Sequence, residues 1–403
     1  MLLYGLNYAP ETVGIGKFSG DMATWLAARG HQVRVITAPP YFPQWRAQGN
    51  RYRRAHSEGV RVWRCPLWVP IQPTGPTRLL HLASFAVSSL PVLLAHRRWR
   101  PDVVLTVAPA FFCAPGALLL GWLCGGRTRT WLHIQDFELD AAFELGMLKG
   151  TLLRRLAEAW ERGTLAGFDR VSTISGAMRR RVVAKGVADH RAVLLPNWVD
   201  LEAIQPQGEE RRAANPYRRE LGIGAEAMVL LYSGSMNRKQ GLDILVEVIQ
   251  QLADLPHMVW LLAGEGPNKA ELAAAMAGLP QVRFLGLQPL ERLNDWLNLA
   301  DVHLLPQRAA AADLVLPSKL LGILASGRPV VASSGAGTEL GQMAEQAGLR
   351  VEPGDGAGFA AAIRRLVGDQ PLRQQRGRAA RQLVEQRFGQ EAVLQQLERE
   401  LHR

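Results

Sequence analysis

Three glycine-containing loops recur in a fixed order between residues 230 and 334, and each follows a short apolar run typical of a buried strand. The loop YSGSMNRKQGLD follows the run 228–232 and precedes a helical pattern at 242–249. The loop LLAGEGP follows the run 258–263, and LPSKLLGILASGRPVVAS follows the run 302–305. Because the carboxyl ends of parallel strands meet at one edge of a sheet, this order predicts an α/β unit with a ligand site at that edge.

The first loop has the composition of an anion site. A turn between a strand and a helix points backbone N–H groups and the positive helix end toward a ligand, and Gly234 and Ser235 lie in that turn. Arg238 and Lys239 add two charges, as a catalytic group that stabilises a departing diphosphate would need. The alternative is a solvated loop with ordinary surface cations.

The second and third loops supply further candidates for the same site. Glycines at the second loop leave room for backbone to approach a ligand, and the third loop reaches the head of a helix through Pro317. The ligand-binding candidates on these two loops are Gly264, Gly266, Ser318, Lys319 and Leu320.

At these residues the chain resembles the retaining glycosyltransferases of the GT-B fold, specifically family 4 (GT4). In the N-terminal half, NYAPETVGIGKFSGDMATWLAARGHQVRVITAPPYFPQWR, RVWRCPLWVP and RLLHLASFAVSSLP are similar to the colanic acid biosynthesis glycosyltransferases of bacterial exopolysaccharide pathways. The resemblance runs from about the first residue to the end. It implies an α/β protein of two Rossmann-like parallel-sheet domains that face a cleft.

The 403 residues exceed the usual size of one core, and strands alternate with helices throughout, which agrees with two domains. We expect an acceptor-binding domain over 1–196, a linker over 197–216, a nucleotide-sugar-binding domain over 217–383, and a C-terminal helix over 384–403 that packs back on the first domain.

The resemblance implies transfer of a sugar from a nucleoside-diphosphate donor, with GDP-fucose preferred and UDP-hexose next, to a polyprenyl-diphosphate-linked saccharide. Neither a cofactor nor a metal is expected, because no DxD-type cluster is present and the cationic side chains replace it. Three cysteines without a CxxC pair also argue against a zinc site. Other possibilities are an inactive GT-B scaffold that binds lipid-linked intermediates or partner enzymes, and a sugar-nucleotide epimerase.

Two N-terminal segments are candidates for the acceptor side. The ionisable groups of HIQDFELD, directly after a predicted strand, suit a polar cleft. The family resemblance makes Asp136 the catalytic candidate, with His133 and Glu138 as acceptor-binding candidates, and the alternative is a surface loop whose acids cap the following helix. The glycine loop before the first helix matches neither a dinucleotide fingerprint nor a P-loop. Family resemblance assigns Gly14 and Gly16 to the donor diphosphate and Lys17 to the acceptor, and the alternative is a tight turn alone.

Positive charge is concentrated in the first half of the chain. Residues 1–200 contain 25 Lys and Arg against 13 Asp and Glu, and the remaining residues contain 22 against 23. No nucleic-acid-binding motif is present, and the family resemblance implies a polyprenyl-diphosphate-linked acceptor in the inner leaflet. We therefore expect an anionic inner-membrane surface as the partner and a cytoplasmic, peripheral location, and the alternative is an arginine surplus without a function. The apolar segment 79–95, with arginines on both sides, is expected to lie in an interface and to be too short to span. The uncharged segment 103–126 is expected to be a buried strand and a short core helix.

The sequence departs from the common family pattern at two places. Two glutamates usual around the third loop would fall near Leu314 and on Gly322, so Asp313, Ser318 with Lys319, or Glu339 must make donor contacts instead. The lysine that usually precedes the glycine of the first loop is replaced by Gln240.

Overall fold

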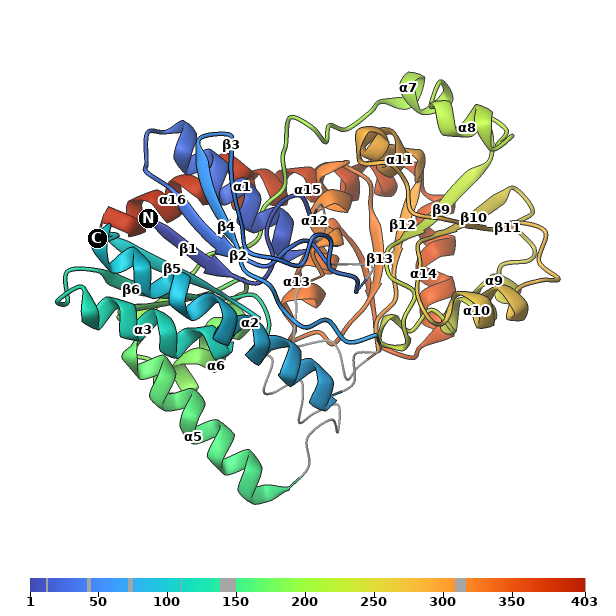
Figure 1. The fold of residues 1–403 in the computed structure, drawn as a ribbon. Coiled ribbons are helices and arrows are strands. Elements are labelled where there is room, and N and C mark those ends of the chain that lie inside the picture. The colour runs from blue at the N-terminus through green and yellow to red at the C-terminus, as the bar shows by residue number, and fades with distance from the viewer. Residues whose placement is uncertain are drawn as a thin grey trace. The chain divides into compact units, whose positions relative to one another are not determined.

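A computed structural model describes residues 1–11, 14–41, 45–71, 75–109, 111–137, 150–308 and 317–402 (Figure 1). The chain divides into two compact units. Unit 1 comprises Met1–Pro196 together with Leu394–Arg403, and unit 2 comprises Asn197–Val393.

Unit 1 contains an eight-stranded sheet in the order β3-β4-β2-β1-β5-β6-β7-β8. Its strands are β1 (Leu2–Gly5), β2 (Arg34–Thr37), β3 (Arg53–Ser57), β4 (Val60–Arg64), β5 (Val103–Ala108), β6 (Arg129–Ile134), β7 (Arg170–Thr173) and β8 (Ala192–Leu194). The pairs are parallel except β3 with β4, which form an antiparallel edge hairpin. Glu58 and Gly59, both with positive φ, make the two-residue turn that this hairpin requires.

The helices of unit 1 follow the strands in the alternation expected from the sequence. They are α1 (Ile15–Ala28), α2 (Gly75–Ala95), η1 (His96–Arg98), η2 (Phe111–Cys113), α3 (Ala114–Leu123), α5 (Thr151–Gly167), α6 (Gly176–Ala184) and η3 (Asp189–Arg191). The segment 103–126 forms a strand followed by the short helix α3, as expected.

The C-terminal helix α16 (Gln390–His402) contributes its last residues to unit 1. It begins later than the expected residue 384, because the preceding helix ends at Arg387. Glu398 accepts hydrogen bonds from Arg29 Nε at 2.9 Å and pairs with His31, while Gln396 Nε2 donates to the Leu194 carbonyl at 2.9 Å. Polar contacts and buried leucines thus join the end of the chain to unit 1.

Helix α2 is longer than the sequence indicated. Among the described residues, the 23-residue stretch Pro76–Arg98 is long and apolar enough to cross a membrane by length and composition, and 33% of its apolar window is buried. The expectation that the segment 79–95 is too short to span is therefore wrong, because helical structure extends it on both sides. Its inner face buries Phe85, and Ser89 Oγ lies 2.7 Å from Tyr4 Oη.

Unit 2 contains a six-stranded sheet in the order β11-β10-β9-β12-β13-β14, and its recorded pairs are all parallel. Its strands are β9 (Met228–Ser233), β10 (Met258–Ala263), β11 (Val282–Leu285), β12 (Val302–Leu305), β13 (Val330–Ser333) and β14 (Gly348–Val351). The apolar runs that predicted β9, β10, β12 and β13 are buried in three hydrophobic clusters. Parallel pairing brings the carboxyl ends of these strands to one edge.

The helical segments of unit 2 are α7 (Glu209–Ala213), α8 (Pro216–Glu220), η4 (Arg238–Gln240), α9 (Ile244–Gln251), α10 (Lys269–Ala275), η5 (Leu290–Arg292), α11 (Leu293–Leu299), α12 (Lys319–Ala325), α13 (Glu339–Ala347), α14 (Gly356–Gly368) and α15 (Gln370–Arg387). Residues 197–216, expected to form a linker, are grouped with unit 2. Val199 bridges to Gly389, and Ile204 is buried in a core cluster.

Candidate functional site

The first two glycine loops of unit 2 pack directly on each other at the carboxyl edge of the sheet. Gly234 N donates to the Ala263 carbonyl, and Met236 N donates to the Glu265 carbonyl, each at 2.9 Å. A Cβ built on Gly264 would lie 1.8 Å from the Gly234 carbonyl oxygen, and Gly264 has a φ of +145°. The backbone of the first loop therefore occupies the place that a side chain at residue 264 would need, and this contact fixes the two loops relative to each other. A Cβ on Gly266 would lie 2.3 Å from the Met236 oxygen.

Lys319 places its ammonium in the middle of this edge. Its Nζ donates to Gln240 Oε1 at 3.0 Å and lies 4.1 Å from the centroid of the Tyr232 ring. A Cβ built on Gly234 would lie 3.2 Å from that Nζ, so the glycine makes room for the lysine. Among the described residues, none of the recorded ion pairs gives Lys319 a carboxylate partner. Desolvation lowers the pKa of Lys319 to about 7.

A partly buried ammonium beside an amide and an aromatic ring is costly unless an anion completes its coordination. Gln240, which stands where the family usually has a lysine, is the residue that holds Lys319 in place. Lys319 was a donor-binding candidate, but its contact with Gln240 was not anticipated, because the two residues lie 79 positions apart. The signal available in the sequence was the missing lysine at 240.

Arg238 and Lys239 lie on η4 in the same loop, and both are exposed. Asn237 caps this turn, with its Oδ1 accepting from Lys239 N at 3.1 Å, and its Nδ2 donates to Ser235 Oγ at 3.0 Å. The structure thus brings two exposed cations of the first loop and the enclosed Lys319 to one edge of the sheet. Contact between these cations and a donor diphosphate remains a prediction.

The other donor-side candidates have different surroundings. Ser318 is exposed at the start of α12, whereas the Leu320 side chain is fully buried in the core, so only its backbone is available to a ligand. Glu339 begins α13 and pairs with Arg387 at 3.5 Å. At Gly322 a Cβ would lie 3.3 Å from Leu297 Cδ1, so a glutamate there would press on the core. Asp313 and Leu314 lie outside the described residues.

In unit 1 the loop before α1 is built around a buried glutamate. A Cβ on Gly16 would lie 2.6 Å from Glu11 Cβ, whereas Gly14 has a φ of +62° and open space around it. Glu11 accepts from Asn7 Nδ2 at 2.8 Å and from Tyr41 N at 3.1 Å. Gly16 thus has a packing role, and the Glu11 network was not among the sequence candidates. Lys17 is half-exposed and its Nζ lies 2.6 Å from Asp21 Oδ2.

The second acceptor-side segment follows β6. His133 is buried, with its Nδ1 2.8 Å from Ser172 Oγ and its Nε2 3.0 Å from Gln135 Nε2. Desolvation lowers the pKa of His133 to about 4, so this ring is neutral at pH 7. Asp136 lies half-buried two residues beyond the strand. Glu138 lies outside the described residues.

Two cationic side chains lie close to Phe137, the residue after Asp136. Phe137 is buried, and Arg181 and Lys185 lie over its ring at 5.4 and 5.5 Å from the centroid. These contacts hold Phe137, and with it the segment that follows β6, against helix α6 and Lys185.

The described residues contain one group with metal-ligand atoms close together: His31, Glu398 and His402, within 4.8 Å of one another. Glu398 already accepts from Arg29 and His31 there, so the cluster is explained as an attachment point of α16. It supports no metal role at the candidate site.

Two α/β units built on largely parallel sheets, with glycine loops at a carboxyl edge, have the architecture of the GT-B class. Residues 13–198 match the glycosyl transferase 4-like domain, and residues 227–369 match the glycosyl transferases group 1 domain. The chain belongs to the GT4 family of glycosyltransferases.

Known relatives agree with this assignment. The putative colanic acid biosynthesis glycosyl transferase WcaI of Escherichia coli (strain K12) is 43% identical over 98% of each chain. The sucrose-phosphate synthase of Thermosynechococcus elongatus has a similar fold, with a TM-score of 0.74, 19% identity, and 99% of this chain and 97% of that chain covered. Anabaena Alr3699/HepE in complex with UDP and glucose has a TM-score of 0.70, 16% identity, and coverage of 100% and 99%.

Proposed function

We propose that this glycosyltransferase moves a sugar from a nucleoside diphosphate to a lipid-linked saccharide during bacterial exopolysaccharide assembly. Unit 2 binds the donor and unit 1 binds the acceptor. Donor binding by unit 2 is supported by the partly buried Lys319 ammonium at the carboxyl edge of the sheet, which has Gln240 as its hydrogen-bond partner. The name of the colanic acid relative supports the pathway, and the UDP complex of HepE supports the donor class.

GDP-fucose is the preferred donor, and UDP-hexoses are the next candidates. The reason is the resemblance to the colanic acid branch. The replacement of the usual glutamate by Gly322 makes the sugar pocket of this chain different from the common pattern, so donor identity needs a direct test.

Glycosyl transfer places growing negative charge on the departing diphosphate, so fixed cations and N–H dipoles near the phosphates stabilise the transition state most. Lys319 is held in place before the donor arrives, because Gln240 and Tyr232 fix its position. Arg238 and Lys239 stand exposed on the same loop and supply charge to the outer phosphate oxygens. With three cations available, the reaction proceeds without a metal ion, and a chelator leaves the rate unchanged.

On the acceptor side Asp136 is the proposed catalytic carboxylate. Its position directly beyond β6 places it on a strand-end segment, and Phe137 with its two cations anchors that segment. His133 is neutral and takes part through hydrogen bonds, and Lys17 contributes a charge near the acceptor. The stereochemistry of the anomeric carbon is retained, with attack from the face of the leaving diphosphate.

The lipid-linked acceptor places unit 1 at an anionic membrane surface. Exposed apolar side chains on unit 1 include Leu80 (61% exposed), Val87 (72%) and Trp122 (75%), and Arg97 and Arg98 are exposed at the end of α2. Apolar side chains with flanking arginines are the composition of an interfacial surface.

The first experiment is thermal stabilisation by GDP, UDP, dTDP and ADP, measured on the wild type and on Lys319→Ala, Lys239→Ala and Arg238→Ala. A ligand at one hundred times its dissociation constant stabilises the native state by about 2.7 kcal/mol. We expect one base to stand out and its shift to disappear in Lys319→Ala. Arg219→Gln, an exposed arginine on α8, is the control for charge removal. If no nucleotide stabilises the wild type, the proposal fails.

A further inference from the structure

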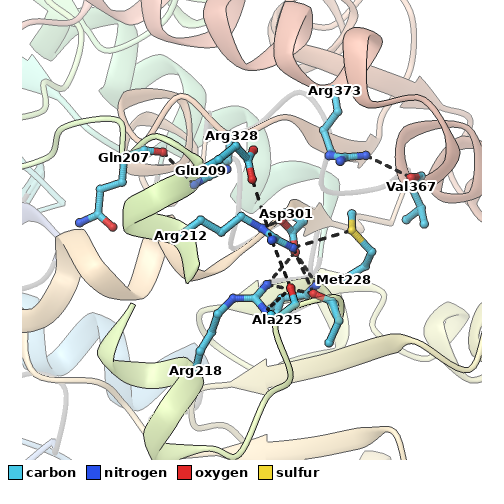
Figure 2. A network of polar contacts seen from close by, with 12 residues as sticks. Gln207, Glu209, Arg212, Arg218, Ala225, Met228, Asp301, Arg328, Val367 and Arg373 are labelled. Carbon is cyan, nitrogen blue, oxygen red and sulfur yellow. Dashed lines mark hydrogen bonds and ion pairs between the residues drawn. The ribbon is translucent and has the colours of Figure 1, made fainter. Parts of the chain in front are cut away.

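A second polar cluster in unit 2 lies at the opposite edge of the sheet from the glycine loops. Asp301 directly precedes β12, and Arg328 lies two residues before β13, so both mark the amino ends of their strands. Figure 2 shows Arg212 and Arg218 on one carboxylate, that of Asp301. This cluster has no part in the donor site.

The Asp301 carboxylate is fully used by its neighbours. Its Oδ2 accepts from Arg212 Nη2 at 3.0 Å, from Arg218 Nη2 at 3.2 Å and from Val229 N at 2.8 Å. Its other oxygen, Oδ1, accepts from Arg212 Nε. Two arginines therefore share one carboxylate, and the cluster keeps an excess positive charge. Glu209 lies 3.9 Å from Arg212 and formally balances this charge, so the net positive charge of the region comes from arginines other than Arg212 and Arg218.

Two further arginines, Arg328 and Arg373, lie next to this cluster, and neither forms an ion pair with a carboxylate of the described residues. Arg328 donates from Nη2 to the Gln207 carbonyl at 3.0 Å, and its buried Nε has no hydrogen-bond acceptor. Arg373 donates from Nη1 to the Leu366 and Val367 carbonyls at 2.7 and 3.1 Å. Burial is the main cause of the lowered pKa of Arg328, and the charges of Asp301 and Glu209 oppose it more than those of Arg212 and Arg373 add to it. An added anion would offset the desolvation of this guanidinium and accept a hydrogen bond from its Nε.

Arg328 and Arg373 line a cavity of about 490 Å³ formed by residues 206–209, residues 326–329 and one face of α15. Arg373 and Arg378 project from α15, Gln374 adds a neutral polar group, and Glu209 adds one carboxylate to the lining. Arg378 is exposed, and no side-chain partner is recorded for it in the part of the chain that the structure describes. A volume of this size falls within the range of small-molecule sites.

The backbone around the cavity is closely packed. A Cβ built on Gly377 would lie 2.1 Å from the Gly327 carbonyl oxygen, so α15 sits directly on the turn that carries Arg328. The arginines are therefore held on rigid elements, which is the arrangement that recognises a planar or tetrahedral anion with bidentate hydrogen bonds.

We propose that this cavity is a second ligand site that binds a phosphate monoester of sugar size. The arginines bind the phosphate, and Gln374 faces the hydroxyl groups. The cavity exceeds what an inorganic phosphate ion fills, so a sugar phosphate binds more tightly than the free ion.

The test is titration calorimetry of the full chain with glucose 6-phosphate, inorganic phosphate and glucose as probes. Saturable binding of glucose 6-phosphate is expected, with weaker binding of phosphate and none of glucose. Arg378→Glu and Arg328→Gln each raise the dissociation constant by about tenfold or more, as expected for loss of a charge-assisted hydrogen bond. Arg378 is exposed, so Arg378→Glu carries the test if Arg328→Gln does not fold.

Two controls separate this site from others. Lys319→Ala removes the donor-site cation and Arg219→Gln removes an exposed charge on α8, and neither changes the binding of glucose 6-phosphate. The proposal is overturned if glucose 6-phosphate does not bind, if Lys319→Ala abolishes binding, or if Arg219→Gln weakens it as much as Arg378→Glu. Equal affinity for phosphate and glucose 6-phosphate overturns the assignment of a sugar phosphate.

Discussion

Lys319 Nζ and Gln240 Oε1 lie 3.0 Å apart, so the amide that replaces the usual lysine of the first loop holds a lysine from the third. The positive charge of the common family pattern is thereby kept at this edge of the sheet but comes from another element.

This replacement makes donor binding dependent on pH. With a pKa of about 7 in the free protein, Lys319 is charged at pH 6 and mostly neutral at pH 9. We expect the dissociation constant of the preferred nucleoside diphosphate to rise by up to about tenfold per pH unit between pH 7 and 9, measured by calorimetry. Lys319→Arg, which stays charged, abolishes this dependence. A wild-type affinity that does not change with pH would contradict the assignment.

The lowered pKa of Lys319 weakens donor binding as the pH rises, but it increases the stability of the free protein. The unfolded lysine titrates near its model value of 10.5 and the folded one near 7, so the unfolded chain binds more protons between these values. The contribution of Lys319 to the free energy of unfolding therefore increases as pH rises from 7 to 10.5. Comparing urea unfolding of the wild type and Lys319→Met over this range isolates that contribution. Equal pH slopes for the two proteins would show that the pKa is unshifted.

Asp136→Asn tests the acceptor side separately from the donor side. We expect kcat to fall by about 100-fold or more, because the amide cannot accept a proton or stabilise positive charge. Nucleotide binding stays at the wild-type level, since the residue belongs to unit 1. Asp189→Asn, an exposed carboxylate of unit 1 that pairs with Arg179, is the matched control and keeps wild-type turnover. Unchanged turnover in Asp136→Asn removes Asp136 from the mechanism.

Gly264→Ala tests the packing of the two glycine loops. The added methyl group would overlap the Gly234 carbonyl, and the φ of +145° disfavours a side chain. We expect a loss of about 3 kcal/mol or more in the free energy of unfolding, measured with urea. Gly278→Ala is the control, because that glycine is exposed and has open space around its Cα. Similar stability of the two variants would show that the loops can separate without cost.

Asp301→Asn tests the buried arginine cluster. Removing the negative charge leaves Arg218 without a counter-ion and Arg212 with only the more distant Glu209, and we expect a loss of about 3–5 kcal/mol in the free energy of unfolding. Asp243→Asn breaks the exposed pair with Arg308 and should cost no more than about 1 kcal/mol. Urea unfolding of both variants is the measurement, and equal losses would contradict the special role of Asp301.

The membrane proposal predicts an effect confined to unit 1. The double variant Leu80→Gln with Val87→Gln reduces binding to vesicles that contain phosphatidylglycerol by about tenfold, because exposed apolar side chains are lost from α2. Leu287→Gln with Leu290→Gln, at exposed positions of unit 2, is the matched control and leaves binding unchanged. Equal effects of the two double variants, in vesicle sedimentation, would rule out α2 as the contact.

The strands of both sheets could be predicted where they are buried on both faces. Apolar runs marked β1, β5, β9 and β10, because parallel strands lie under helices on both sides. The edge strand β3 is exposed along its whole length and carries no apolar run, so the hairpin with β4 was missed. Helix α2 was placed correctly but its length was underestimated, since its ends are charged or polar.

The candidate site could be predicted in part because its loops have short, regular spacing. Gly234, Gly264 and Lys319 were chosen from local sequence, and the structure brings them to one edge. The contact of Lys319 with Gln240 and the packing of Gly16 on Glu11 depend on tertiary structure. A single sequence does not encode such contacts in any local pattern.

Helix α12 links the two edges of the second sheet. It begins at Lys319 and ends at Ala325, where the turn Ser326–Gly327 enters the arginine-lined cavity. A helix of seven residues is a rod of roughly 10 Å, and it is too short to absorb strain by bending. Evolution or engineering can therefore adjust the position of the donor-site ammonium from the far side of the sheet, through substitutions that never touch the nucleotide.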